Sequence, residues 1–240
     1  MKHIAQQMVN GFLLPINALT FLFKNPLFLI GSLILLLTPM ALSIGLEYVL
    51  LTTTNFTRES AIFFIFPLMN IFFLFMIAFG ADHKLHHRPY TFSSLFKSVI
   101  KKIVPLTIIA LVWGTISWFI PVFLGRGSAL INTTITAVLI TYLSVFIADL
   151  VHERGILETV KQSLLLIYRG FWQLTGGLTT ICALTFFPPF AVYKIIEYSG
   201  DPLRYTVAIT AISIIIIWNI ILSCATIVFG VMLHQKASHR

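Results

Sequence analysis

The chain has 240 residues, of which 58% are apolar and only 10% are charged, and its formal net charge is +8. Its mean hydropathy is +0.95. Because a soluble domain usually carries about 25% charged residues, too few charges remain here to cover a water-soluble globule of this length. The composition therefore argues against a soluble globular domain and indicates that a lipid bilayer surrounds most of the chain.

Six apolar runs are long enough to cross a membrane, since one crossing needs about 20 residues. They occupy residues 27–51, 60–80, 103–124, 130–150, 173–196 and 205–233. Together they leave no room for a separate soluble domain. The sequence therefore predicts an all-α integral membrane protein with six transmembrane helices and a single polytopic domain over residues 1–240. No cleavable signal peptide is predicted, because the first long apolar run already has full span length.

The basic residues are concentrated on one side of these predicted spans. Twelve of the sixteen fall in residues 1–26, 81–102, 151–172 and 234–240, namely Lys2, Lys24, Lys84, Arg88, Lys97, Lys101, Lys102, Arg154, Lys161, Arg169, Lys236 and Arg240. Four acidic residues lie on each side, so the formal charges are +8 (12 − 4) and 0 (4 − 4). The excess of Lys and Arg predicts that this side, with both termini, is cytoplasmic.

The basic residues flank the spans, which favours anionic lipid head groups over nucleic acid as their partner. Each Lys or Arg near such a surface contributes about 1 kcal/mol. We therefore predict membrane lipids as partners, another membrane protein as a further candidate, and no nucleic acid. The predicted head-group contacts are Lys84, Arg88, Lys101, Lys102, Arg154, Lys161 and Arg169.

Three segments share one plan, in which a basic amphipathic helix precedes an outward and a returning span. Their beginnings are "INALTFLFKNPLFLIGSL", "FSSLFKSVIKKIVPLTII" and "LETVKQSLLLIYRGFWQL", with junctions at about Pro26, Pro105 and Trp172. This spacing predicts an internal threefold repeat. The alternative is that any protein with an even number of spans yields hairpins with basic inner flanks.

The third amphipathic segment carries an apolar stripe with helical periodicity. Its members are Leu157, Val160, Leu164, Ile167 or Tyr168, and Phe171, while Glu158, Lys161, Gln162 and Arg169 take the other side. Such a helix lies in the head-group plane or packs under the bundle, with Trp172 at the water boundary. The charges are then interpreted as a solvated face rather than as a binding site.

The stretches "VHERGILETVKQSL", "YTFSSLFKSVIKKIVPL" and "WFIPVFLG" resemble an uncharacterised six-helix bacterial inner-membrane family of the YciC type. A related module is fused to glycerophosphodiester phosphodiesterases as their membrane part. The resemblance covers roughly residues 85–175 and implies a multi-pass protein of the bacterial inner membrane. It brings no activity, cofactor or catalytic residue. The chain departs from the family where a Pro-Gly is expected, because Pro121 is followed only by Gly125 and Gly127.

The strongest candidate for chemistry is "DHKLHH", in which His83, His86 and His87 have metal-ligand spacing on one helical face. Membrane desaturases and hydroxylases use three such boxes, whereas the other histidines here are scattered. We therefore predict no metal and no cofactor, and interpret this stretch as a basic interfacial turn. No nucleophile elbow, Walker loop, CxxC pair or carboxylate pair predicts a catalytic residue.

No ionisable residue lies in the middle of a predicted span, which argues against a proton-coupled transporter. Glu47 and Asp149 lie near span ends, where they pair with a base or reach the surface. Pro188 and Pro189 are predicted to bend or break the fifth span. Polar residues that hydrogen-bond between helices, or that line a path, are Asn70, Asn132, Thr136, Thr141 and Asn219.

These observations favour a non-enzymatic multispan inner-membrane protein that acts through lipids or protein partners. The alternative is a transporter or channel for an uncharged or lipid-like substrate, which would use the bent spans and the polar fourth span. A third hypothesis is a lipid-modifying metal enzyme with ligands at His83, His86 and His87.

Overall fold

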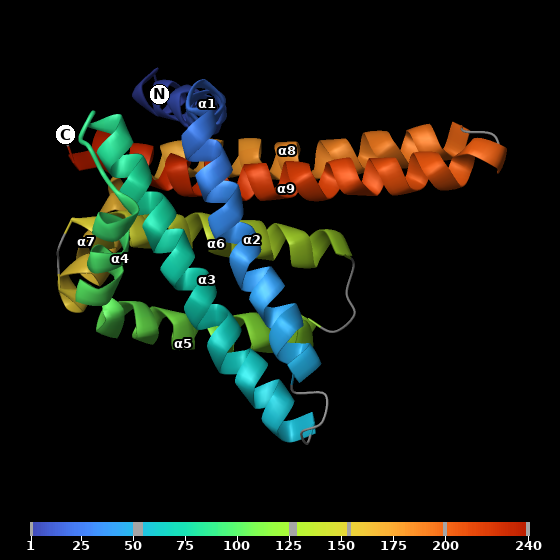
Figure 1. The fold of residues 1–240 in the computed structure, drawn as a ribbon. Coiled ribbons are helices and arrows are strands. Elements are labelled where there is room, and N and C mark those ends of the chain that lie inside the picture. The colour runs from blue at the N-terminus through green and yellow to red at the C-terminus, as the bar shows by residue number, and fades with distance from the viewer. Residues whose placement is uncertain (1, 50–54, 125–128, 153–154, 199–200, 239–240) are drawn as a thin grey trace.

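The computed structural model describes residues 2–49, 55–124, 129–152, 155–198 and 201–238. Across these residues the chain forms nine α-helices and no strand, which confirms the all-α prediction (Figure 1). The helices are α1 (Lys2–Lys24), α2 (Pro26–Val49), α3 (Asn55–Leu85), α4 (Phe92–Lys101), α5 (Ile103–Leu124), α6 (Ala129–Val151), α7 (Ile156–Arg169), α8 (Phe171–Tyr198) and α9 (Asp201–Ser238).

The six predicted spans coincide with α2, α3, α5, α6, α8 and α9. Among the described residues, three stretches are long and apolar enough to cross a membrane, and five are if each of two bent helix pairs counts as one span. The three are Ile65–Leu85, Phe171–Val192 and Ala208–Lys236, and a shorter apolar helix covers Val138–Val151. The structure therefore supports a multi-spanning membrane protein, while the number six stays a prediction.

Three helical hairpins, α2–α3, α5–α6 and α8–α9, diverge from one end of the molecule (Figure 1). Helices α4 and α7 and both chain termini lie at this same end. The chain bends by 104° between α1 and α2 and by 76° between α4 and α5. The junctions fall at Asn25, Lys102 and Gly170, close to the positions that the sequence predicted.

Glycines allow α1 to cross α8 at very short range. A Cβ added at Gly176 would lie 2.6 Å from the carbonyl oxygen of Met8, and one added at Gly11 would overlap the carbonyl oxygen of Gln173. Small residues of this kind let two backbones approach closely, which is how helices associate where lipid removes the hydrophobic driving force. The crossing attaches the first helix to the third hairpin.

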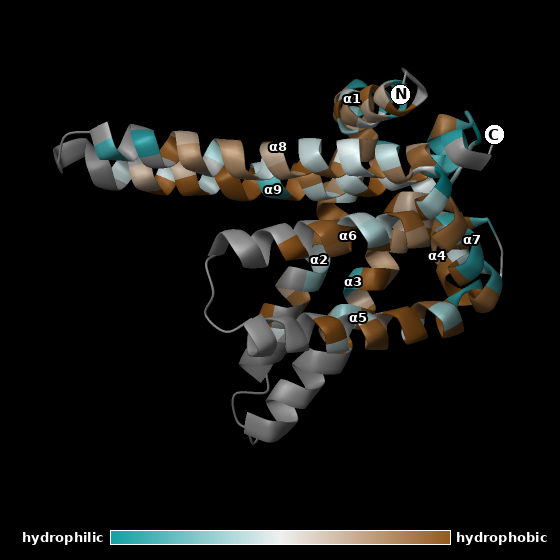
Figure 2. Ribbon diagram, turned by 180° about the vertical axis from the view of Figure 1, so that it is seen from behind, coloured by the Kyte–Doolittle hydropathy of each residue, from teal (hydrophilic) through white to brown (hydrophobic). Residues whose placement is uncertain are grey.

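The core lies where α3, α6 and α9 converge, and its fully buried side chains include Phe75, Ile147 and Phe229. Apolar residues line the hairpins, whereas hydrophilic residues concentrate near α4, α7 and the C-terminus (Figure 2). This segregation agrees with a molecule whose hairpins lie in hydrocarbon and whose convergent end meets water.

Of the predicted bend or break at Pro188 and Pro189, the break does not occur, because α8 continues through both residues. A proline has no backbone N–H, so the carbonyl of Leu184, four residues before Pro188, loses its helical donor. The indole Nε1–H of Trp218 in α9 donates to that carbonyl at 2.8 Å. A neighbouring helix therefore satisfies the freed group, which is how transmembrane helices tolerate proline.

Candidate functional site

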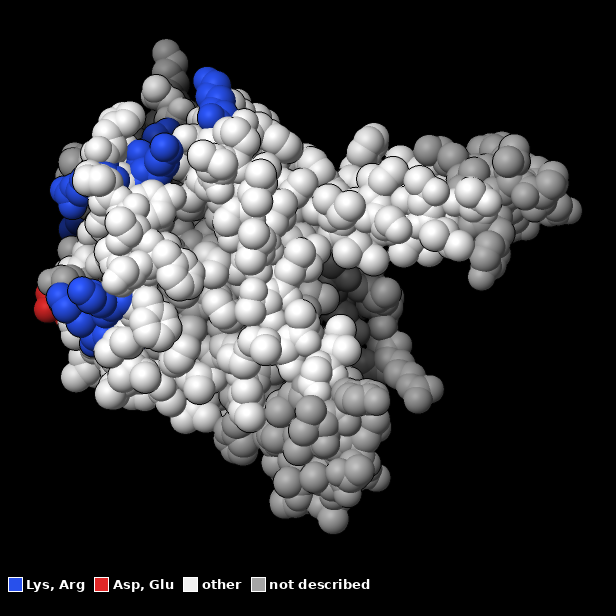
Figure 3. Space-filling view, viewed as in Figure 1, with Lys and Arg blue, Asp and Glu red and all other residues white. Residues whose placement is uncertain are grey.

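We name the end of the molecule that carries α4, α7 and both termini the basic end. Lys and Arg side chains gather there on the visible surface, and the rest of that face carries none that the structure describes (Figure 3). Five of the seven predicted head-group contacts are exposed: Lys84, Arg88, Lys101, Lys161 and Arg169. Lys102 is half-buried, and Arg154 lies outside the described residues.

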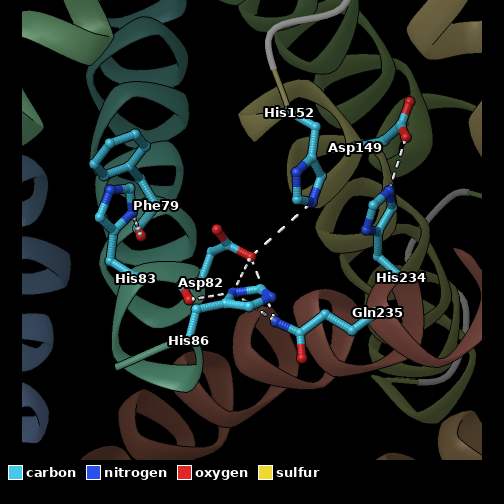
Figure 4. Close-up of polar contacts among 8 residues, drawn as sticks. All are labelled: Phe79, Asp82, His83, His86, Asp149, His152, His234 and Gln235. Atoms are coloured by element: carbon cyan, nitrogen blue, oxygen red, sulfur yellow. Dashed lines mark hydrogen bonds and ion pairs between the residues drawn. The ribbon is translucent and has the colours of Figure 1, made fainter. Parts of the chain in front are cut away.

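Beneath the basic end, six polar residues meet where α3, α6 and α9 converge (Figure 4). We call this group the polar cluster; it comprises Asp82, His86, Asp149, His152, His234 and Gln235. Asp82 lies in α3 with His86 directly after the end of that helix, Asp149 lies in α6 with His152 directly after its end, and His234 and Gln235 lie in α9. Each hairpin therefore contributes the last turns of its second helix.

One half of the polar cluster is centred on Asp82, whose carboxyl group is almost fully buried. Its Oδ1 lies 3.3 Å from His86 Nδ1 and 4.0 Å from His152 Nε2. The side-chain amide of Gln235 donates to the same oxygen at 3.4 Å. A buried carboxylate is costly unless it is paired and hydrogen-bonded; here one partner is four residues away in the same segment, and the other two come from the ends of α6 and α9.

The other half is centred on Asp149, which has 0% exposure. Its Oδ1 lies 3.0 Å from Nε2 of the buried His234. The ring of His234 stacks on that of His152, with centroids 4.3 Å apart and planes 18° apart. The two halves are thus joined through stacked imidazoles, and Asp149 pairs with a histidine rather than reaching the surface.

The sequence contains a signal for this cluster that residue-by-residue inspection missed. The pattern Phe-x-Ala-Asp occurs at 79–82 and again at 146–149, and a histidine follows each aspartate within one helical turn. Both copies end the second helix of a hairpin. In the third hairpin, Phe229 is followed by His234 without an aspartate. The repeated pattern therefore relates the ends of two of these helices, although neither copy identifies its partner.

The structure does not assemble His83, His86 and His87 into a ligand group. His83 stacks on the ring of Phe79 at 4.1 Å, and its Nδ1 lies 3.1 Å from the Phe79 carbonyl oxygen. His86 turns instead toward Asp82, while His87 has a positive φ of 55° after the helix end. Among the described residues no group of three or more His, Cys, Asp or Glu has the geometry to hold a metal ion.

Helix α4, at the basic end, begins with a capping box. The Thr91 side chain accepts from the Ser94 backbone N–H at 3.2 Å, and the Ser94 hydroxyl accepts from the Thr91 backbone N–H at 2.9 Å. These hydrogen bonds satisfy backbone N–H groups that have no acceptor within the first turn of the helix. The helix buries Leu95 and Val99, while its aromatic Phe92 and Phe96 remain exposed.

Helix α7 buries Thr159, Ser163 and Leu166, and of its apolar stripe the half-buried Ile167 also packs against the core. Other members of the stripe are at the surface, where Leu157 is 87% and Tyr168 is 82% exposed. Lys161 and Arg169 are exposed on another side of the same helix. The helix therefore has three faces: one toward the protein with Thr159, Ser163 and Leu166, an apolar face, and a charged face on which Glu158 accompanies the two bases.

The residues predicted to line a polar path have separate environments. The Asn219 amide donates to the Ile215 carbonyl of its own helix at 2.9 Å. Thr141 is buried and Asn70 is half-buried. The side chains of Asn132 and Thr136 lie outside the described part of the chain.

No family model matches this sequence, and no curated protein or solved structure matches it. The function therefore has to be inferred from the site itself.

Proposed function

We propose that this protein is a non-enzymatic, multi-pass membrane protein that acts through anionic lipids at one leaflet. The observation that carries the proposal is the surface of α7, where exposed apolar side chains such as Leu157 and Tyr168 adjoin the exposed bases Lys161 and Arg169. A helix with these two faces places its apolar side in the acyl boundary and its bases among head groups. Helix α4 repeats the arrangement with Phe92, Phe96 and the exposed Lys97.

The proposed topology has six spans in three units, each an amphipathic helix followed by a hairpin, with both termini cytoplasmic. The order of helices supports it, since α1, α4 and α7 each precede one hairpin. The gathering of Lys and Arg at the basic end supports the orientation. The bacterial inner membrane and the relation to the YciC-type family stay predictions, for which the resemblance over residues 85–175 is the support.

The polar cluster has a positioning role in this proposal. It joins the ends of α3, α6 and α9 through the Asp82 and Asp149 carboxylates and the stacked His152 and His234 rings. Because α4 and α7 follow α3 and α6 in the chain, fixing these helix ends keeps both surface helices at one level. Two amphipathic helices at one level can contact one leaflet together.

The geometry gives less support to the other two hypotheses. A polar path for a substrate would need side chains such as Asn219 to face it, but the amide of Asn219 bonds to its own helix. A metal enzyme would need His83 and His86 to converge, but these two histidines turn to Phe79 and Asp82. Lipid contact at the basic end is thus the function that the described residues support best.

The test is lipid selection by the purified protein in nanodiscs that contain phosphatidylglycerol and phosphatidylcholine. We expect the protein to retain phosphatidylglycerol above its bulk fraction, as measured by native mass spectrometry. The double variant Lys161→Gln/Arg169→Gln should lose about fivefold in preference per removed charge, since each charge contributes about 1 kcal/mol. The matched control is Lys194→Gln, because Lys194 is exposed on α8 and pairs with Glu197 at 2.7 Å. Equal retention of both lipids, or an equal loss in the control, would contradict the proposal.

A further inference from the structure

Two apolar grooves occupy corresponding places in the first two hairpins. The first lies between α2, α3 and the segment that begins α4, with a volume of about 350 Å³ and Met76 and Tyr90 among its walls. The second lies between α5, α6 and α7, with a volume of about 370 Å³. In both cases the amphipathic helix of the following unit closes the groove between the two helices of a hairpin. Both volumes fall in the range of small-molecule sites, about 300–1,000 Å³.

The second groove, which we call the α7 groove, is apolar and opens on a surface that a membrane would cover. Trp113, Leu143 and Phe146 form its inner walls, and Leu164 of α7 forms part of its edge. Val112, also in its wall, is 54% exposed. A water-soluble ligand would gain few polar contacts here, whereas a hydrocarbon chain from the surrounding lipid matches the walls.

The α7 groove contains a buried hydroxyl whose hydrogen-bonding capacity is unused. Ser163 lines the groove and is only 3% exposed. Its hydroxyl has no hydrogen-bond partner among the residues that the structure describes. A buried polar group without a partner costs about 1–3 kcal/mol, and such groups are uncommon enough to require an explanation. A ligand with an acceptor oxygen at this position would remove the cost.

We propose that the α7 groove binds one acyl chain of an anionic phospholipid from the surrounding membrane. The chain lies along Val112, Leu143 and Phe146, and the ester oxygen accepts a hydrogen bond from the Ser163 hydroxyl. The phosphate then lies at the basic end, where Lys161 and Arg169 of the same helix are exposed. This inference rests on the proposed function and identifies where on the protein the lipid is held.

The test uses phosphatidylglycerol with a photoactivatable diazirine on its acyl chain, incorporated into nanodiscs with the full-length protein. After illumination, mass spectrometry locates the labelled residues. We expect label to concentrate on the walls of the α7 groove. Val112→Trp should reduce this labelling at least fivefold, because the indole fills the groove from its exposed edge. Ile214→Trp is the matched control, since Ile214 is similarly exposed on α9 outside the groove.

A second variant separates the polar contact from the shape of the groove. Ser163→Ala removes one hydrogen bond and should weaken lipid retention about fivefold, the equivalent of about 1 kcal/mol. If Val112→Trp does not fold, as judged by its thermal unfolding, Val160→Trp fills the groove from the α7 side instead. The proposal that the α7 groove binds lipid is overturned if the label is uniform over all hairpins, or if neither Val112→Trp nor Val160→Trp reduces the labelling of the groove. If the groove is overturned but the preference for phosphatidylglycerol still depends on Lys161 and Arg169, the proposed function stands. If neither the groove labelling nor this preference is observed, both proposals are overturned.

Discussion

At the scale of single residues, the buried pair of Asp149 and His234 joins α6 to α9 at the basic end. The two residues lie 85 positions apart in the chain, and their side chains meet at 3.0 Å. Neither residue has a local sequence pattern that identifies the other. Position near a span end predicted that Asp149 would find a base or the surface, and only the packing of α6 against α9 determines which.

The pair should behave as a coupled unit in unfolding experiments. Asp149→Leu leaves Nε2 of His234 buried without its acceptor, so we expect a loss of about 1–3 kcal/mol in the free energy of unfolding. The double variant Asp149→Leu/His234→Leu should cost less than the sum of the two single variants, since the unpaired group is gone. Chemical unfolding in detergent, followed by circular dichroism, gives all three values.

Glu158→Leu is the control for this cycle, because Glu158 is exposed on α7 and should change stability by no more than about 0.5 kcal/mol. Strictly additive costs for the two single variants would show that the contact between Asp149 and His234 contributes no stability.

The histidine-rich stretch shows the limit of spacing as a predictor. Positions i, i+3 and i+4 share a helical face, but the helix ends at Leu85, between His83 and His86. His87 then adopts a positive φ, and the common face is lost. The spacing predicts ligands only when the helix continues through all three residues.

At the scale of helices, periodicity predicted where α7 lies but not which of its sides faces the protein. The apolar stripe was equally compatible with burial and with lipid contact. Thr159 and Ser163 are small, so they allow α7 to approach the other helices, and the larger Leu157 and Tyr168 stay outside. In a membrane protein the apolar side of a surface helix can contact either the protein interior or the lipid, and the sequence pattern does not distinguish the two.

The crossing of α1 and α8 should depend on the absence of a side chain at Gly176. In Gly176→Val, the new Cβ would lie 2.6 Å from the Met8 carbonyl, so the helices must separate. Overpacking of this kind costs about 1–3 kcal/mol. We expect a lower unfolding temperature and faster proteolysis within α1. Gly45→Val is the matched control, because a Cβ at Gly45 meets nothing within 4 Å; the crossing is not tight if both variants behave alike.

At the scale of the whole molecule, composition and charge predicted the class of protein and the segregation of bases to one end. They did not predict how the hairpins diverge. A helix that is surrounded by apolar groups on every side shows no periodic alternation of polar and apolar residues from which its neighbours could be identified. Contacts such as that of Trp218 with Leu184 depend on single residues. The repeated Phe-x-Ala-Asp at 79–82 and 146–149 was the sequence feature that related two of the hairpin ends.

The central claim, that the basic end faces one side of a membrane and the hairpins cross it, is tested most directly by cysteine accessibility in intact cells. Single cysteines replace Lys97, Lys161, Lys236 and Arg126 in a chain that lacks Cys182 and Cys224. Arg126 lies between α5 and α6, outside the described residues. A membrane-impermeant maleimide should label position 126 from outside, and positions 97, 161 and 236 only after the membrane is opened. Equal labelling of position 126 and the other three positions before opening would contradict the account.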